Sequence, residues 1–357
     1  MSSSLGSRTH GAFQTLPVVD VSDLASPEPM RRRRAAEALG RATREAGFLY
    51  VVGHGVPPAL GARLVEQAAA FFALPLERKL ELYIGRSANH RGYVPAGEEV
   101  FYGGGVDLKE AFDLALDLPA EDPAVRAGTP MLGPNIWPDL PGFKDVVQDY
   151  YQAVFALGRR LLRGFALALG LREETFDAFV TKPPSQLRLV HYPYHADAGD
   201  GAGAGIAAHT DYECFTILLP TAPGLEVMNG EGAWVDAPPL DDALVVNVGD
   251  LLEIWTNGAF VATSHRVRPV REERFSFPLF FCCDYHTEVA PLPAFVGPDR
   301  PARYEAVRAG EHLYAQTIQS FKYMQARLAA GDVALPTGAR PPSSFGQAAR
   351  HREGQTG

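Results

Sequence analysis

The pattern of hydrophobic and polar positions divides the chain into a helix-rich first half and a β-rich second half. Before residue 186, apolar residues recur at spacings of three and four over 143–170, which predicts a long helix. Residues 28–46 have a helical composition rich in Ala, Arg and Glu, and 59–82 form a second predicted helical region. Gly47 and Gly170 mark helix ends, and Pro75 interrupts the second pattern. The runs LPVVDVSDL and FLYVVGHGV are typical of short strands. We therefore predict helices interspersed with a few strands up to residue 185.

From residue 186 onward, short apolar or alternating runs follow one another, separated by Gly, Pro, Asn and Asp. The runs are QLRLVHYPY, CFTILLP, GLEVMN, ALVVNVG, LLEIWTNG, FVATSHRVRPV and RFSFPLFFCCDY. Short strands at this spacing predict a β-sandwich or barrel. Asn257-Gly258 lies between two apolar runs and predicts a tight hairpin.

Segments between and beyond these runs complete the predicted organisation. A Gly- and Pro-rich stretch over 83–142 is too long for a plain connection, so we expect it to carry loops that line a pocket. No linker separates two domains, and both ends of the chain are poor in apolar residues. We predict a disordered N-terminus (1–15), one unit (16–330, comprising a helical part at 16–185, a β core at 186–290 and a C-terminal helix at 301–330) and a disordered tail (334–357).

Composition and charge narrow the classes of function. Of the 357 residues, 46% are hydrophobic and 21% charged, and the formal net charge is −9. An acidic chain disfavours nucleic acid and anionic membranes as partners. No apolar run reaches the about 18 residues of a membrane span, and the N-terminus has no apolar signal region.

Cysteine usage points to the compartment. Three cysteines (Cys214, Cys282 and Cys283) are too few for a disulfide framework. We expect a reduced, cytoplasmic protein that is a monomer or a weak homo-oligomer and acts on a small molecule.

One pair of side chains, placed directly before CFTILLP, carries metal chemistry. His209 and Asp211 are two positions apart, so on an extended segment both point to the same side and could reach one ion. A third ligand is then expected, and His265, 56 residues later in a strand-like run, is the best candidate. Two histidines and one carboxylate leave positions open on the ion, as in non-haem Fe(II) oxygenases. Taken alone, the pair also fits a capping Asp beside a core His.

A second pair of polar residues, Arg274 and Ser276, supports the interpretation of His209 and Asp211 as part of a ligand-binding site. Arg274 and Ser276 share one face of a strand, nine residues after His265. A guanidinium and a hydroxyl together bind a carboxylate. Their neighbours in RFSFPLFF are apolar, and an unpaired cation there would carry a large desolvation cost, so Arg274 should hold an anion.

These residues resemble the iron- and 2-oxoglutarate-dependent dioxygenases, in the branch around isopenicillin N synthase. The resemblance covers roughly residues 16–330. It rests on the two pairs, on His265, on the spacings of 56 and nine residues, and on the segments LPVVDVSDL, GFLYVVGHGVP, RGYVPAGEE, KEAFDL, NVGDLLEIWTNG and ATSHRV. YVPAGEEV and AAHTDY are also similar to bacterial ethylene-forming enzyme.

The resemblance implies a mainly β fold with flanking helices, whose core is a distorted double-stranded β-helix, the jelly roll. It implies Fe(II), 2-oxoglutarate and O₂, with oxidation, most often hydroxylation, of a small molecule while 2-oxoglutarate becomes succinate and CO₂. The implied iron ligands are His209, Asp211 and His265. The implied 2-oxoglutarate contacts are Arg274, Ser276 and Tyr192. Many plant members have Asn where this chain has Val190, and Arg188 is a candidate to compensate.

The substrate pocket is less well determined by the sequence. Glu98 and Glu99 could bind a cationic group, although an ion pair of one of them with Lys109 or Arg91 is the interpretation we favour. Aromatic residues could line an apolar wall, although such residues are more often found in cores. The candidates are Tyr93, Phe101, Trp255, Phe260 and Phe280.

Two other functions fit the same residues. One is an Fe(II) oxidase that uses O₂ without 2-oxoglutarate, as isopenicillin N synthase does, because that enzyme uses the same Arg-x-Ser pair on its substrate. The other is a barrel that binds metal and ligand as a sensor without turnover, which the combination of triad and Arg274-x-Ser276 disfavours.

Overall fold

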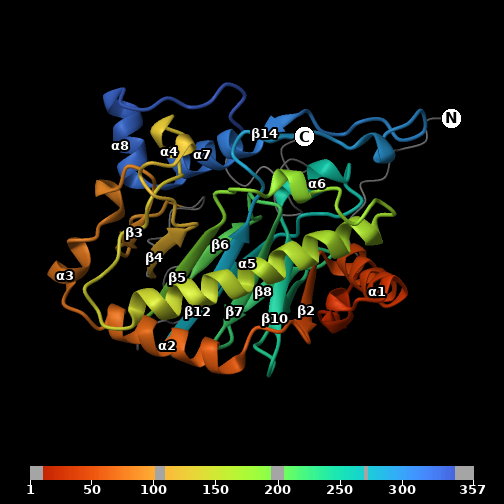
Figure 1. The fold of residues 1–357 in the computed structure, drawn as a ribbon, viewed down its shortest axis with the longest axis horizontal. Coiled ribbons are helices and arrows are strands. Elements are labelled where there is room, and N and C mark those ends of the chain that lie inside the picture. The colour runs from red at the N-terminus through yellow and green to blue at the C-terminus, as the bar shows by residue number, and fades with distance from the viewer. Residues whose placement is uncertain (1–10, 101–108, 194–204, 269–271, 342–357) are drawn as a thin grey trace.

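Two β-sheets form the centre of the protein, shown in Figure 1 as a computed structural model that describes residues 11–100, 109–193, 205–268 and 272–341. The strands of the large sheet are β1 (Val18–Asp20), β2 (Phe48–Val52), β3 (Gly92–Val94), β4 (Glu110–Ala115), β5 (Gln186–Tyr192), β7 (Phe215–Pro220), β10 (Leu244–Val248) and β12 (Arg274–Phe281). The strands of the small sheet are β6 (Ile206–His209), β8 (Leu225–Met228), β9 (Trp234–Asp236) and β11 (His265–Val267). A separate pair joins β13 (Glu288–Val289) to β14 (Val307–Arg308).

Strand order shows how distant parts of the chain meet. The large sheet runs β1-β2-β10-β7-β12-β5-β4-β3 and the small sheet runs β6-β11-β8-β9. Apart from the parallel pair β1 and β2, the neighbours in both sheets are antiparallel. Inward-facing apolar residues of alternating strands fill the space between such sheets. The predicted jelly-roll core is confirmed.

Helices cover the outer side of the large sheet and its ends. They are α1 (Pro29–Ala46), α2 (Pro58–Phe72), α3 (Leu76–Leu80), α4 (Pro123–Arg126), α5 (Phe143–Ala168), α6 (Asp250–Trp255), α7 (Ala309–Ser320) and α8 (Lys322–Ala330). The long helix α5 lies across the sheet (Figure 1). It approaches β12 so closely that a Cβ on Gly158 would overlap the ring of Phe281. The helices predicted at 28–46 and 143–170 are confirmed, and Gly47 ends α1 with a φ of 64°.

One predicted strand and one predicted hairpin are wrong. The run LLEIWTNG forms helix α6, whose residues are all buried. A short apolar run has no clear period, so burial alone does not distinguish a strand from a helix. Asn257 and Gly258 do have positive φ values of 51° and 75°, but this turn ends α6 instead of joining two strands.

Parts of the predicted disordered ends are ordered on the fold. Phe13 is buried, and its carbonyl accepts a hydrogen bond from Asn229. The carbonyl of Arg340 accepts hydrogen bonds from Gln316 and Gln319. In these places one apolar or backbone contact outweighs the polar composition of the surrounding segment.

All three cysteines are buried and carry free thiols. Among the described residues, no helix combines the length and the apolar composition that crossing a membrane requires.

Candidate active site

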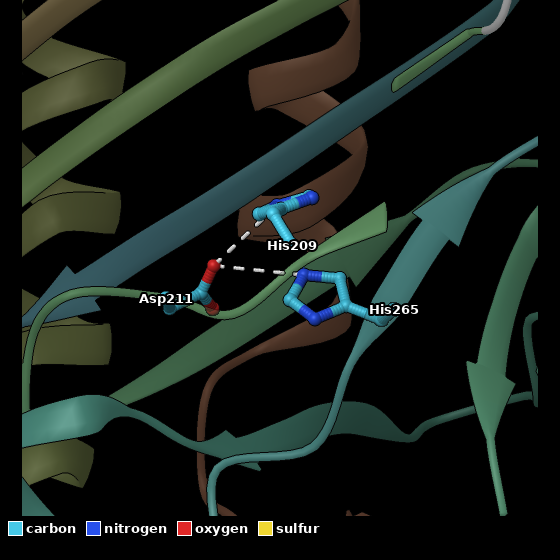
Figure 2. A group of neighbouring side chains, drawn as sticks. All are labelled: His209, Asp211 and His265. Carbon is cyan, nitrogen blue, oxygen red and sulfur yellow. Dashed lines mark ion pairs between the residues drawn. The ribbon is translucent and has the colours of Figure 1, made fainter. Parts of the chain in front are cut away.

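Two neighbouring strands of the small sheet bring three metal-binding side chains together (Figure 2). His209 ends β6, Asp211 follows it, and His265 begins β11. The strands pair so that His209 and His265 are direct cross-strand partners. One ligand atom from each of the three residues lies within 4.8 Å of the others. The sequence predicted this trio, and the register of β6 and β11 explains how residues 56 positions apart meet.

Hydrogen bonds orient the carboxylate of Asp211. Its Oδ1 lies 3.7 Å from Nε2 of His209 and 3.5 Å from Nε2 of His265. Its Oδ2 accepts hydrogen bonds from Nδ2 of Asn247, over 2.7 Å, and from the hydroxyl of Thr216. One oxygen is therefore held by the protein while the other faces both imidazoles.

Sequence analysis missed Thr216 and Asn247. Each is a single polar residue inside an apolar strand, in CFTILLP and in ALVVNVG, and each is buried. A buried polar side chain needs a partner, so the isolated polar position in a core strand was the available signal.

The imidazoles are arranged to present Nε2. Nδ1 of His209 lies 2.8 Å from the carbonyl of Ala207, and Nδ1 of His265 lies 3.3 Å from that of Thr263. A carbonyl partner fixes the proton on Nδ1 and leaves Nε2 as a donor to metal. Burial, and then the proximity of His265, lower the pKa of His209 to about 4, so its ring is neutral at neutral pH.

The carboxylate completes a donor set that fits a divalent metal. Burial opposes the ionisation of Asp211, but His265, His209, Asn247 and Thr216 together lower its pKa below the usual value. Two imidazole nitrogens and one anionic oxygen, with their second atoms held by the protein, suit Fe(II) with open positions.

The segment that carries Asp211 is docked on the start of α6. Backbone N–H groups of Gly249, Asp250 and Leu251 donate to the carbonyls of residues 214, 211 and 213, at 2.9, 2.9 and 3.1 Å. A Cβ on Gly249 would overlap the carbonyl oxygen of Glu213. The glycine before α6 thus allows the close approach that positions the metal-binding segment.

The trio opens into a cavity whose empty space, open solvent included, is about 1030 Å³. Arg274, Ser276 and Tyr192 line it, and Arg274 and Tyr192 are direct partners on β12 and β5. The Arg274 guanidinium lies 4.7 Å from the centre of the Tyr192 ring.

Arg274 has the features of an anion-binding group. It is fully buried, and its Nε donates to the carbonyl of Ala222 over 3.2 Å. Its Nη1 has no hydrogen-bond partner among the described residues. A buried cationic nitrogen without a partner is costly, so this geometry fits a ligand carboxylate. The structure brings together Arg274, Ser276 and Tyr192, as expected.

Arg188 lines the same cavity, but carboxylates already hold it. Its guanidinium donates twice to Asp113, both over 2.7 Å, and once to Glu99. Glu99 also pairs with Lys109. Burial opposes the ionisation of Glu99, but Arg188 and Lys109 lower its pKa to about 2. The ion pair of Glu99 with Lys109 that we favoured is confirmed.

The substrate-pocket candidates divide between cavity and core. Glu99 and Phe280 line the cavity. Tyr93, Trp255 and Phe260 are wrong, because they pack in the hydrophobic core against other aromatic rings. Glu98 instead accepts a hydrogen bond from the backbone of Tyr323, and Phe101 lies outside the described residues.

Glu213 is a cavity residue that the sequence analysis did not single out. It is buried two positions after Asp211. Burial, and then the negative charge of Asp211, raise its pKa to about 8, so it is mostly protonated at neutral pH.

Comparisons with known proteins agree with this geometry. A family profile described as the 2OG-Fe(II) oxygenase superfamily matches residues 183–283, and one described as the non-haem dioxygenase in morphine synthesis N-terminal matches residues 16–140. A homoarginine-6-hydroxylase from Oryza sativa subsp. japonica is 32% identical over 325 residues, covering 87% of this chain and 98% of that protein.

Solved structures give the same result. A full-length Neurospora crassa protein in complex with alpha-KG aligns with a TM-score of 0.73 and 27% identity, over 90% of this chain and 99% of that one. JOX2 in complex with 2OG, Fe and JA aligns with a TM-score of 0.70 and 25% identity, over 88% and 89%. These relatives support the use of 2-oxoglutarate over the oxidase alternative. The chain therefore belongs to the 2OG-Fe(II) oxygenase superfamily and is an Fe(II)- and 2-oxoglutarate-dependent dioxygenase.

Proposed function

We propose that this dioxygenase hydroxylates a small molecule at the cavity between its two sheets. In this proposal His209, Asp211 and His265 hold Fe(II). Arg274, Ser276 and Tyr192 bind the distal carboxylate of 2-oxoglutarate. Two relatives support a small-molecule substrate: one is named a homoarginine-6-hydroxylase, and JOX2 was solved in complex with JA.

One observation carries the proposal: three possible metal ligands and a buried arginine line the same cavity, and Nη1 of this arginine has no hydrogen-bond partner in the described parts of the chain. A dicarboxylic acid that chelates a metal at one end needs a cationic partner for its other end. The cavity offers both, within one continuous surface of β5, β12 and the small sheet.

Each part of the chain has a defined task in this reaction. When bound, Fe(II) and 2-oxoglutarate supply the oxidising chemistry, with O₂ consumed and succinate and CO₂ formed. Thr216 and Asn247 hold the Asp211 carboxylate in one orientation. Apolar residues such as Leu218, Leu225 and Val267 line the cavity and limit the entry of water.

Anaerobic titration of the protein with Fe(II) and 2-oxoglutarate tests the proposal. We expect a visible charge-transfer band, followed by succinate formation when air is admitted. No band and no succinate would contradict the proposed function.

The variant Asp211→Ala should lose both the band and at least about a thousandfold of succinate formation, because two histidines alone hold a catalytic ion weakly. Circular dichroism checks that the variant is folded. Asp236→Ala, at an exposed position of β9, is the matched control and should behave as the wild type. Full activity of Asp211→Ala would show that the ligand assignment is wrong.

A further inference from the structure

Gln186, the first residue of β5, is a buried amide that the fold leaves unsatisfied. Its side chain lines the cavity and is only 6% exposed. Its Nε2 has no hydrogen-bond partner in the part of the chain that the structure describes. Leaving a buried donor unpaired is costly, so the position fits an acceptor supplied by a ligand.

Register places Gln186 two strands away from Thr216, the residue that donates to Asp211. The partner of Gln186 on β12 is Phe280, and the partner of Phe280 on β7 is Thr216. Strands lie about 4.8 Å apart, so Gln186 and Thr216 are about 10 Å apart across the sheet. A small molecule spans that distance.

The same strand separates Gln186 from the 2-oxoglutarate end. Tyr192 lies six positions after Gln186 along β5, about 20 Å away at roughly 3.3 Å per residue. Gln186 is therefore too far from Arg274 to share the distal carboxylate of 2-oxoglutarate. Its position matches the opposite end of the cavity, where a substrate would lie.

The surroundings of Gln186 indicate an uncharged ligand. On this wall of the cavity Arg188, Lys109 and Glu99 are already paired with one another, and Asp113 holds the other side of Arg188. The cavity lining also includes Phe280 of β12, Leu313 of α7 and Phe321, together with the hydroxyl side chains of Thr317 and Ser320. A charged ligand would have to break a buried ion pair, whereas an uncharged acceptor would only have to meet Nε2.

We propose that Gln186 binds the substrate by donating a hydrogen bond from Nε2 to a carbonyl oxygen, and that the substrate is a small uncharged carbonyl compound with an apolar or aromatic body. This inference rests on the proposed function, because it assumes that metal and 2-oxoglutarate occupy the other part of the cavity.

Three probes of similar size test the chemistry. Acetophenone carries a neutral carbonyl, ethylbenzene replaces it with a methylene, and benzoate carries a charge. Each is titrated anaerobically into the protein loaded with Fe(II) and 2-oxoglutarate, and the change in the charge-transfer band gives the dissociation constant. The variants are Gln186→Leu, which removes the amide at similar volume, and Gln186→Asn, which keeps a shortened amide.

The matched control is Gln67→Leu. Gln67 lies on α2, half-buried and outside the cavity lining, and its Oε1 is also unpartnered among the described residues. Its substitution should therefore leave probe binding unchanged.

We expect acetophenone to bind the wild type at least tenfold more tightly than ethylbenzene or benzoate, since a site built to donate rejects an analogue without the acceptor. Gln186→Leu should reduce the preference over ethylbenzene to within about twofold, Gln186→Asn should keep part of it, and Gln67→Leu all of it.

Three results of the probe titrations would overturn the inference, and a fourth result concerns the charge-transfer band. The three are equal or tighter binding of ethylbenzene or benzoate by the wild type, an unchanged preference in Gln186→Leu, and no binding of acetophenone up to its solubility. Loss of the charge-transfer band in Gln186→Leu alone would also overturn it, because Gln186 would then serve 2-oxoglutarate. Absence of the band in the wild type would instead indicate failure of the proposed function.

Discussion

Two arginines that line one cavity have opposite environments. Arg188 on β5, whose side chain is 12% exposed, donates to Asp113 and Glu99 and is saturated by carboxylates. Arg274 on the adjacent strand β12 is fully buried, yet its Nη1 has no partner among the described residues. The Arg188 guanidinium therefore takes part in ion pairs within the protein, whereas the Arg274 guanidinium keeps a nitrogen that could donate to a ligand.

Neighbouring strands account for the difference. The direct partner of Arg188 on β4 is Asp113, an anion, while the direct partner of Arg274 on β5 is Tyr192, an aromatic ring. A cavity-lining arginine is therefore informative only once its cross-strand partners are known. The predictions below test this contrast, beginning with the largest expected effect.

Removal of the saturated arginine should affect stability most. Arg188→Met leaves the buried carboxylates of Asp113 and Glu99 with less cationic compensation, so we expect the free energy of unfolding to fall by about 3–5 kcal/mol. Urea denaturation measures it. Arg266→Met, which breaks a more exposed pair with Glu226, should cost under about 1 kcal/mol. A loss for Arg188→Met as small as the control would contradict the contrast.

Removal of the unsaturated arginine should affect ligand binding instead. Arg274→Met would eliminate the proposed charge-assisted hydrogen bond to 2-oxoglutarate, so the dissociation constant of 2-oxoglutarate should rise about 10–100-fold with little loss of stability. Titration of the charge-transfer band measures this constant. Arg274→Lys should recover part of the affinity because it restores charge without the planar fork. An unchanged dissociation constant would mean that other residues bind the distal carboxylate of 2-oxoglutarate.

Support of the metal ligand should have a smaller effect. Asn247→Leu removes one of the two donors to Oδ2 of Asp211, and we expect about tenfold weaker Fe(II) binding, at the lower end for such partners. Equilibrium dialysis of Fe(II) under anaerobic conditions measures it. Asn229→Leu, a buried Asn that contacts Phe13 away from the cavity, is the control for loss of packing. Equal losses in both variants would indicate a general structural effect.

The smallest expected effect is on pH dependence. The pKa of His209 is lowered to about 4 in the folded state, below the ordinary value of 6.5. As the pH falls, His209 is therefore protonated in the unfolded state before it is protonated in the folded state. The contribution of neutral His209 to folding stability is present above pH 6.5 and is lost as the pH falls toward 4. Between pH 7 and 5.5, the metal-free His209→Asn variant should lose about 1 kcal/mol less stability than the wild type. Urea denaturation at the two pH values measures these losses. Equal losses of stability in the wild type and in His209→Asn would contradict the lowered pKa of His209.

Sequence patterns were most reliable where a single physical property repeats. The helix at α5 follows from its apolar period, and the helix at α1 from its Ala-, Arg- and Glu-rich composition and the glycine that ends it. The strand predicted for LLEIWTNG, which forms α6, was wrong because a fully buried segment has no alternation of apolar and polar faces. Tyr93, Trp255 and Phe260 failed for a related reason, since an aromatic side chain serves core and pocket equally well.

The sequence by itself determined the chemical identity of the site: two histidines, a carboxylate and an Arg-x-Ser pair at spacings that one family shares. Only the tertiary structure decided which polar groups have partners. It showed Asp211 oriented by Thr216 and Asn247. It also showed that Arg274 and Gln186 each have a side-chain nitrogen without a hydrogen-bond partner among the described residues. The physical reason is that hydrogen-bond satisfaction depends on cross-strand neighbours, which are set by the register of strands far apart in the chain.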